Sequence, residues 1–129
     1  RRLNDLWSTR GEKRYELDDI MLLKVGRHLR PRPNFKLIIG REEGENNFLN
    51  GYRKQFVHLS SVSHDGPLTL IEGDTSEEDI MLAARLTARF GQGRDATCVS
   101  VEITDKSGAT RRLDVPPLKI DDIPQDWYL

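Results

Sequence analysis

Hydrophobic residues recur at a period of two in two stretches of the chain, and each stretch predicts a β-hairpin. In the first, residues 27–40, the side chains of Phe35, Leu37 and Ile39 fall on one face of a strand at a period of two. The tetrapeptide Pro-Arg-Pro-Asn at positions 31–34 predicts the connecting turn, because proline fixes φ and asparagine tolerates unusual backbone angles. We therefore expect two antiparallel strands here.

The second hairpin is expected near the C-terminus. Val99, Val101 and Ile103 alternate with polar residues, and the sequence Asp-Lys-Ser-Gly at positions 105–108 predicts a turn. The returning strand contains Leu113. This pattern predicts a strand pair with one face buried and the other facing water.

A helical period is clearest in residues 76–90, where Ala83 and Ala84 belong to an apolar stripe. Thr75 and Glu78 have the spacing of a capping box, in which the hydroxyl and the carboxylate each accept a free backbone N–H. The pattern predicts a helix that packs this stripe against the sheet.

Weaker patterns complete the order of elements. They predict short helices over residues 1–9, 17–25 and 42–54, and short strands over 56–59 and 67–71. The resulting order is helix, hairpin, helix, two strands, helix, hairpin. It predicts an α+β fold with a mostly antiparallel sheet and two to three helices packed on one face.

A chain of 129 residues is long enough for one domain with a real core. We expect a single domain with three parts: a helical lead-in (1–25), a core (26–117) and a C-terminal tail (118–129). The aromatic pair Trp127-Tyr128 in the tail either packs back onto the core or docks on a partner. Because the chain begins with Arg1 rather than Met, we expect it to be a fragment of a longer protein.

Charge is distributed unevenly along the chain, although the formal net charge is only −1. Residues 1–41 contain eleven Lys or Arg and five Asp or Glu, for a net charge of +6, whereas residues 42–80 contain two and nine, for −7. Two interpretations remain open. The two regions form solvated faces that attract each other, or the basic region forms a surface for phosphate groups.

No apolar run approaches the roughly 18 residues that a membrane-spanning helix needs. The first residues also lack the apolar segment of a secretory signal peptide. The single cysteine, Cys98, excludes an internal disulfide and is typical of a reducing compartment. These features predict a cytoplasmic protein without membrane contact.

The sequence contains no motif typical of a catalytic or metal site. His28, His58, His64 and Cys98 do not have the spacing of metal ligands. Cys98 has two interpretations, a small packing residue or a partly exposed reactive thiol. The glycines form no phosphate-binding loop. We therefore expect no metal, no cofactor and no catalysis by this chain itself.

Basic and amide side chains occur near the end of the first hairpin, a combination that can contact RNA. Arg41 follows Gly40 at an expected junction of strand and helix, where free N–H groups attract phosphate. Asn46 and Asn47 come about one turn later. The alternative is a plain turn followed by a solvated helix face. The candidate RNA contacts are Arg27, His28, Arg30, Arg32, Gly40, Arg41, Asn46, Arg53 and Lys54.

The run KLIIGREEGENNFL at positions 36–49 resembles the glycine-arginine signature of the NFACT-R domain family. In that family a strand ends in Gly-Arg and an asparagine follows on the next helix. The run LLKVGRHLR at positions 22–30 is similar to a block of one branch, the C-terminal module of bacterial proteins similar to tRNA 2-thiouridylases, which have an N-terminal PP-loop ATPase domain. The resemblance covers most of residues 20–92.

This resemblance implies an RNA-binding domain whose partner is tRNA and which serves the thiolation-type modification carried out by an attached N-terminal catalytic domain. It assigns Gly40, Arg41 and Asn46 to the RNA site. Glu42 departs from the family pattern, which often has asparagine there, and it adds negative charge where a phosphate would approach. The alternative function is a protein-interaction or dimerisation module with no RNA contact.

Overall fold

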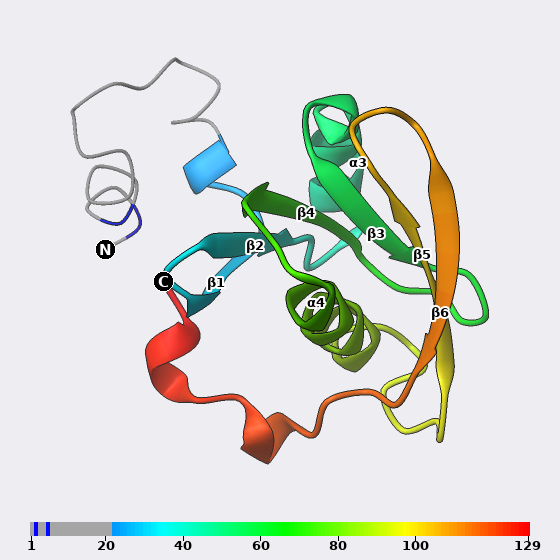
Figure 1. The fold of residues 1–129 in the computed structure, drawn as a ribbon. Coiled ribbons are helices and arrows are strands. Elements are labelled where there is room, and N and C mark those ends of the chain that lie inside the picture. Colours follow the sequence, from blue (N-terminus) through cyan, green and yellow to red (C-terminus); the bar gives the residue numbers. More distant parts are fainter. Residues whose placement is uncertain (1, 3–4, 6–21) are drawn as a thin grey trace.

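Six strands form one antiparallel sheet, with strand order β1-β2-β4-β3-β5-β6 (Figure 1). The computed structural model describes Arg2, Asp5 and residues 22–129. The strands are β1 (Arg27–Arg32), β2 (Phe35–Ile39), β3 (Val57–Ser61), β4 (Leu68–Gly73), β5 (Val99–Thr104) and β6 (Thr110–Val115). The helices are α3 (Glu43–Asn50) and α4 (Glu77–Arg89). The expected α+β class is confirmed.

Both expected hairpins are present. Arg32 pairs with Phe35 at the end of the first, and Val99 pairs with Val115 at the open end of the second. Between them, β4 and β3 are inserted beside β2, so that β2 pairs with β4 rather than with its successor β3. The helices expected at residues 1–9 and 17–25 lie almost entirely outside the described residues.

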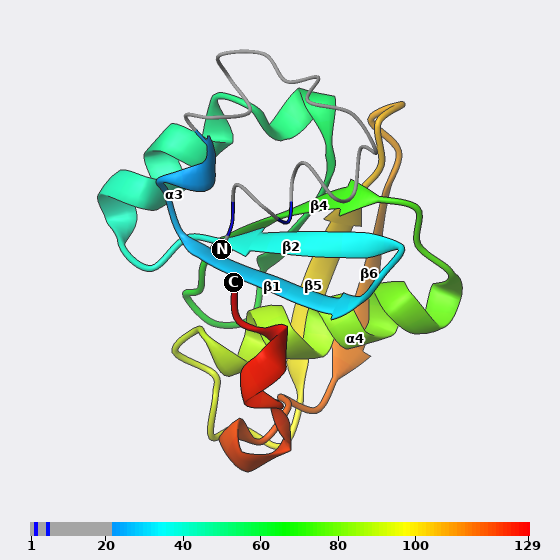
Figure 2. The ribbon, with the colours of Figure 1, turned by 90° about the vertical axis from the view of Figure 1, so that its left-hand side faces the viewer.

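The two helices cover opposite faces of the sheet, which corrects the expectation that the helices share one face (Figure 2). All residues of β2 are buried. Leu37 and Ile39 belong to the large core with α4, whereas Ile38 packs with Leu49 of α3 and Leu70 of β4. A strand that is apolar on both faces needs cover on both sides, so one helical layer is not enough.

Helix α4 packs through the expected stripe of small residues, and Ala83, Ala84 and Thr87 are fully buried. The Thr87 hydroxyl lies 2.8 Å from that of Thr69 on β4 and 2.8 Å from the carbonyl of Ala83, so the buried hydroxyls are paired.

The N-terminus of α4 begins one residue later than the sequence pattern indicates. The capping box consists of Ser76 and Asp79, in place of the expected Thr75 and Glu78. Asp79 N–H donates to the Ser76 hydroxyl at 3.2 Å, and Ser76 N–H donates to the Asp79 carboxylate at 3.0 Å. Since both pairs have the same spacing, only the backbone conformation distinguishes them.

Helix α3 is shorter than the predicted 42–54. It ends at Asn50, and a separate 3-10 turn follows at Arg53–Gln55. Gly51 caps the helix, and asparagine and glycine are poor helix formers. The break places Arg53 and Lys54 on the 3-10 turn beside the start of β3.

The C-terminal tail packs back onto the domain. Leu118 and Ile123 are buried in the core beside α4, and Trp127 and Tyr128 pack against that core. Leu129 N–H donates to the His28 carbonyl at 2.9 Å, which places the tail along the outer edge of β1. An edge strand with unpaired backbone groups would otherwise invite association with another chain. None of the helices in the described part of the chain is long and apolar enough to cross a membrane.

His28 lies in the interior of this edge. Its ring is 1% exposed, and its Nε2 lies 3.0 Å from the Leu22 carbonyl and 2.9 Å from the Val25 carbonyl. Because carbonyls only accept, Nε2 carries the proton of a neutral ring. Burial first, and then the positive charges of Lys36 and Arg2, lower the pKa of His28 from 6.5 to about 3.

We predict that His28 makes the fold labile in acid. An unfolded chain binds the His28 proton below about pH 6.5, whereas the folded chain resists it down to about pH 3. The contribution of neutral His28 to the free energy of unfolding is therefore fully present above pH 6.5. It decreases as the pH falls towards 3, by at most about 1.4 kcal/mol per pH unit. Urea unfolding of the wild type and of His28→Gln between about pH 3 and pH 6.5 measures this pH dependence of the unfolding free energy. Equal pH dependence in both proteins would contradict the prediction.

Candidate nucleic-acid interface

Three of the expected RNA contacts are engaged within the fold. His28 is buried, so its assignment as an RNA contact is corrected. Arg30 binds both carboxylate oxygens of Asp5, at 2.6 and 2.8 Å, and its side chain is only 14% exposed. Arg32 pairs with the buried carboxylate of Asp79 at the start of α4. Polar residues on the edge strand β1 are thus used to attach neighbouring segments.

Gly40 and Asn46 form a backbone junction between β2, α3 and β4. Gly40 N–H donates to the Leu68 carbonyl at 3.1 Å, and the Asn46 amide oxygen accepts Leu68 N–H at 3.1 Å. A Cβ on Gly40 would overlap that amide oxygen. The glycine is needed because the asparagine side chain passes directly over it. We name this contact the Gly40–Asn46 junction.

Arg41 extends from this junction and is fixed by Glu45 one turn later. Its Nε lies 2.9 Å from Oε1 of Glu45, and its Nη2 lies 2.8 Å from Oε2. The same carboxylate accepts the backbone N–H groups of Arg41 and Gly26. The hydrogen bonds from Arg41 are the main cause that lowers the pKa of Glu45 to about 2. Arg41 therefore has a fixed direction, while 49% of its side chain remains exposed.

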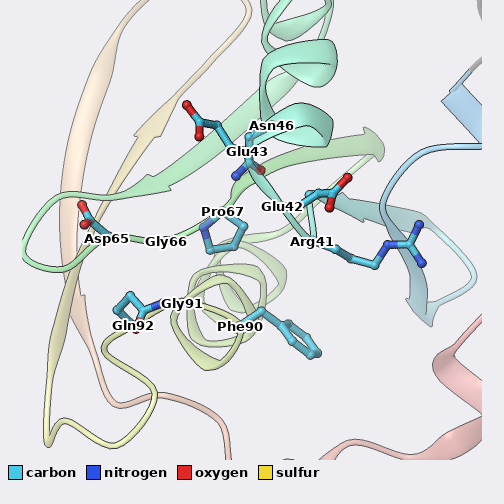
Figure 3. Close-up of a pocket in the computed structure, with 11 residues that line it drawn as sticks. Arg41, Glu42, Glu43, Asn46, Asp65, Gly66, Pro67, Phe90, Gly91 and Gln92 are labelled. Carbon is cyan, nitrogen blue, oxygen red and sulfur yellow. The ribbon is translucent and has the colours of Figure 1, made fainter.

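A cleft of about 650 Å³ lies beside the junction, between the N-terminus of α3, the loop that leads into β4 and the C-terminus of α4 (Figure 3). The loop and the end of α4 approach closely, since a Cβ on Gly91 would lie 3.0 Å from the Gly66 Cα. Gln92 N–H donates to the Asp65 carbonyl at 2.6 Å. The volume is within the range of ligand sites.

The two ends of this cleft differ in chemistry. Arg41 and Phe90 lie at one end in Figure 3, and Asp65 and Gln92 lie at the other. The guanidinium of Arg27 lies 4.5 Å from the centre of the Phe90 ring, which gives this end a cation-aromatic pair. An aromatic ring that carries one arginine, in a cleft that a second arginine lines, offers stacking for a base and charge for its phosphates.

Carboxylates also line the cleft, at Glu42, Glu43 and Asp65. The N-cap residue Glu42 makes no side-chain cap, so the first N–H groups of α3 lack that partner. Carboxylates repel phosphate, but they accept hydrogen bonds from base amino groups and from ribose hydroxyls. The arrangement therefore suits a base and its ribose inside the cleft, with the phosphates outside near the arginines.

Arg53 and Lys54 do not line the cleft. They line a second hollow region on the open part of the sheet, with His58 and Lys106. The sequence pattern did not indicate Phe90, His58 or Lys106 as contacts, because each is separated by many residues from the Gly40–Asn46 junction. The structure thus divides the expected contacts between the cleft, the hollow region and β1, where His28 is buried and Arg30 and Arg32 form ion pairs.

The other chemical candidates lie apart from the cleft. Cys98 is exposed just before β5 and is absent from the cleft lining. Within the described residues, no three His, Cys, Asp or Glu side chains are grouped so as to hold a metal ion.

Comparison with known proteins gives a family and a fold. A family model described as NFACT protein RNA binding domain matches residues 26–128. A solved structure, the C-terminal part of the fibronectin/fibrinogen-binding protein from Streptococcus suis, superimposes with a TM-score of 0.63 at 19% sequence identity. The alignment covers 90% of this chain but only 55% of that one, so the chain spans about half the length of that neighbour. No curated protein matches.

We predict that the Gly40–Asn46 junction tolerates no side chain at Gly40. Gly40→Ala forces the Asn46 amide away from Leu68 N–H, and overpacking of this kind costs about 1–3 kcal/mol of unfolding free energy. The matched control is Gly44→Ala, where the nearest atom to the added Cβ lies 3.8 Å away. This substitution raises the unfolding free energy by about 0.4–1 kcal/mol, because alanine has less conformational freedom than glycine in the unfolded chain. Chemical denaturation measures both. Equal stability of the two variants would contradict the role of the junction.

Proposed function

Since this chain belongs to the NFACT protein RNA-binding domain family and is an RNA-binding domain, we propose that its RNA partner is tRNA and that the cleft beside Arg41 is its primary contact. The observation that carries the choice of site is the cation-aromatic end of the cleft. There Arg41 is held in a fixed direction by Glu45, and the Phe90 ring lies under the guanidinium of Arg27.

Each part of the cleft has a role in this proposal. Phe90 stacks on an unpaired base, while Arg27 and Arg41 neutralise the flanking phosphates. Glu42 and Glu43 accept hydrogen bonds from donors on the base edge or from the ribose 2′-hydroxyl. The acidic residue after Gly-Arg, which departs from the family pattern, thus favours the sugar and base side of the nucleotide over its phosphate.

We further propose that the domain catalyses no reaction itself and acts within a longer cytoplasmic protein, presenting tRNA to an attached modification domain of the thiolation type. The support is the similarity of residues 22–30 to the C-terminal module of proteins similar to tRNA 2-thiouridylases. The alternative, a protein-interaction module, relied in part on the aromatic tail. That tail is packed on the domain's own core.

We predict that tRNA binds with marked salt dependence and that Arg41→Ala weakens it about three- to tenfold, with the salt slope reduced by about 1. The matched control is Arg111→Ala. Arg111 is 46% exposed and pairs with Glu77 through two hydrogen bonds, as Arg41 does with Glu45, but it lies at the opposite end of α4. Filter-binding titrations across a salt series measure both variants.

Three outcomes would contradict the proposal. Wild-type protein that retains no tRNA at low salt, or a slope near zero, would exclude RNA binding of the proposed kind. An equal effect of Arg41→Ala and Arg111→Ala would remove the cleft as the site. A concentration-dependent dimer in sedimentation, unchanged by added RNA, would favour the protein-interaction module.

A further inference from the structure

The sheet face on which α3 packs is only partly covered. Helix α3 contacts β4, whereas the polar side chains of β3 and β5 on the same face line a groove of about 400 Å³. Its walls include Asn50, His58 and Thr104. A second hollow of about 350 Å³ lies at the β5–β6 turn and shares Arg53, His58 and Thr104 with the first. We call the two together the sheet groove.

The sheet groove contains cations that the fold does not use. Lys54 and Lys106 are exposed and form no ion pair with any carboxylate in the described part of the chain. Arg53 donates to the Asn50 carbonyl at 2.9 Å, which fixes its direction while leaving its charge unneutralised. Three positive charges therefore line one hollow and have no carboxylate partner among the described residues, as a site for a polyanion requires.

The carboxylates of the sheet groove are already engaged. Asp105 accepts the Ser107 hydroxyl at 2.5 Å and the Ser107 and Ala109 N–H groups, and the Ser107 hydroxyl is the main cause that lowers the pKa of Asp105. Glu102 lies 3.6 Å from Arg112 on the neighbouring strand. These hydrogen bonds leave Asp105 ionised, and Arg112 offsets the charge of Glu102. The three cations Arg53, Lys54 and Lys106 still outnumber Asp105, so the net charge of the sheet groove is positive, in contrast to the carboxylate-lined cleft.

Groups that recognise bases and sugars lie beside these cations. Asn47 and Asn50 are exposed on α3 with no side-chain hydrogen bond among the described residues. The Nδ1 of His58 lies 3.2 Å from the Phe56 carbonyl, so Nδ1 carries the proton and Nε2 is a free acceptor in the neutral ring. Amide donors and acceptors with an imidazole acceptor suit base edges and 2′-hydroxyls of unpaired RNA.

The sheet groove is continuous with the cleft, because Asn46 and Gly66 line both. We propose that a single-stranded RNA segment enters the cleft at Phe90, passes over Asn46 and continues through the sheet groove to Lys54 and Lys106. This inference rests on the proposed function and deepens it. It assigns the phosphates to the lysines and the unpaired bases to the asparagines of α3.

The test uses fluorescence anisotropy with tRNA and with oligouridylates from about 3 to about 16 nucleotides, lengths that span the site sizes of single-stranded nucleic acid on small β-domains. Wild-type affinity rises with length. We expect the double variant Lys54→Ala/Lys106→Ala to bind the shortest RNA with wild-type affinity and the longest RNA with about tenfold lower affinity. Its slope of log affinity against log salt on the longest RNA becomes shallower by about 1.4, since each lost phosphate contact contributes about 0.7. The control variant Arg111→Ala/Lys119→Ala loses the same charge, and we expect it to leave the affinity and the salt slope unchanged.

The outcomes separate the two proposals. If the lysine variant equals the wild type on long RNA while Arg41→Ala still weakens binding, the sheet groove is excluded and the cleft remains. Binding of tRNA without binding of any oligouridylate would also contradict the proposal that single-stranded RNA occupies the sheet groove. Failure of the wild type to bind any RNA would contradict both the proposed function and the proposed RNA path through the sheet groove. Thermal melting of each variant confirms that the substituted surface is folded.

Discussion

The candidate interface depends on one hydrogen bond, in which the Asn46 side-chain oxygen reaches across Gly40 and accepts the backbone N–H of Leu68. Together with the hydrogen bond from Gly40 N–H to the Leu68 carbonyl, it closes the end of β2 against the start of β4 and fixes where α3 begins. The start of α3 then determines the position of Glu45, and Glu45 determines the direction of Arg41. A short sequence motif thus fixes the direction of Arg41 through two successive hydrogen-bonded contacts, first between Asn46 and Leu68 and then between Glu45 and Arg41.

The same junction explains why two different surfaces meet at α3. On one side the helix N-terminus faces the end of α4 and forms the carboxylate-lined cleft. On the other side the helix packs against β2 and β4, and the polar side chains of β3 and β5 line the sheet groove. Asn46 belongs to both surfaces. In the proposed path, RNA passes from a carboxylate-lined cleft with arginines at one end to a groove where lysines contact the phosphates and asparagines contact the bases.

The hairpins and the α+β class could be predicted from the sequence, because a period of two and strong turn residues are local signals. The cleft could not, since Phe90 and Asp65 come to line one cleft with Arg41 only through the insertion of β4 between β2 and β3. The burial of His28 and the ion pair of Arg30 with Asp5 could not be predicted for a related reason. Polar residues on an edge strand suggest exposure, but here their partners are the Leu22 and Val25 carbonyls and the Asp5 carboxylate, which the pattern of β1 does not reveal.

The central claim is that RNA lies on the surface around α3. Its most direct test is an NMR titration of the nitrogen-15-labelled domain with tRNA, followed through the backbone amide signals. The account predicts shifts concentrated at Arg41, Glu43 and Gly91, and at Asn47 and Lys106 along the sheet groove. Shifts confined to the outer face of α4 or to the C-terminal tail, or no shifts at all, would contradict it.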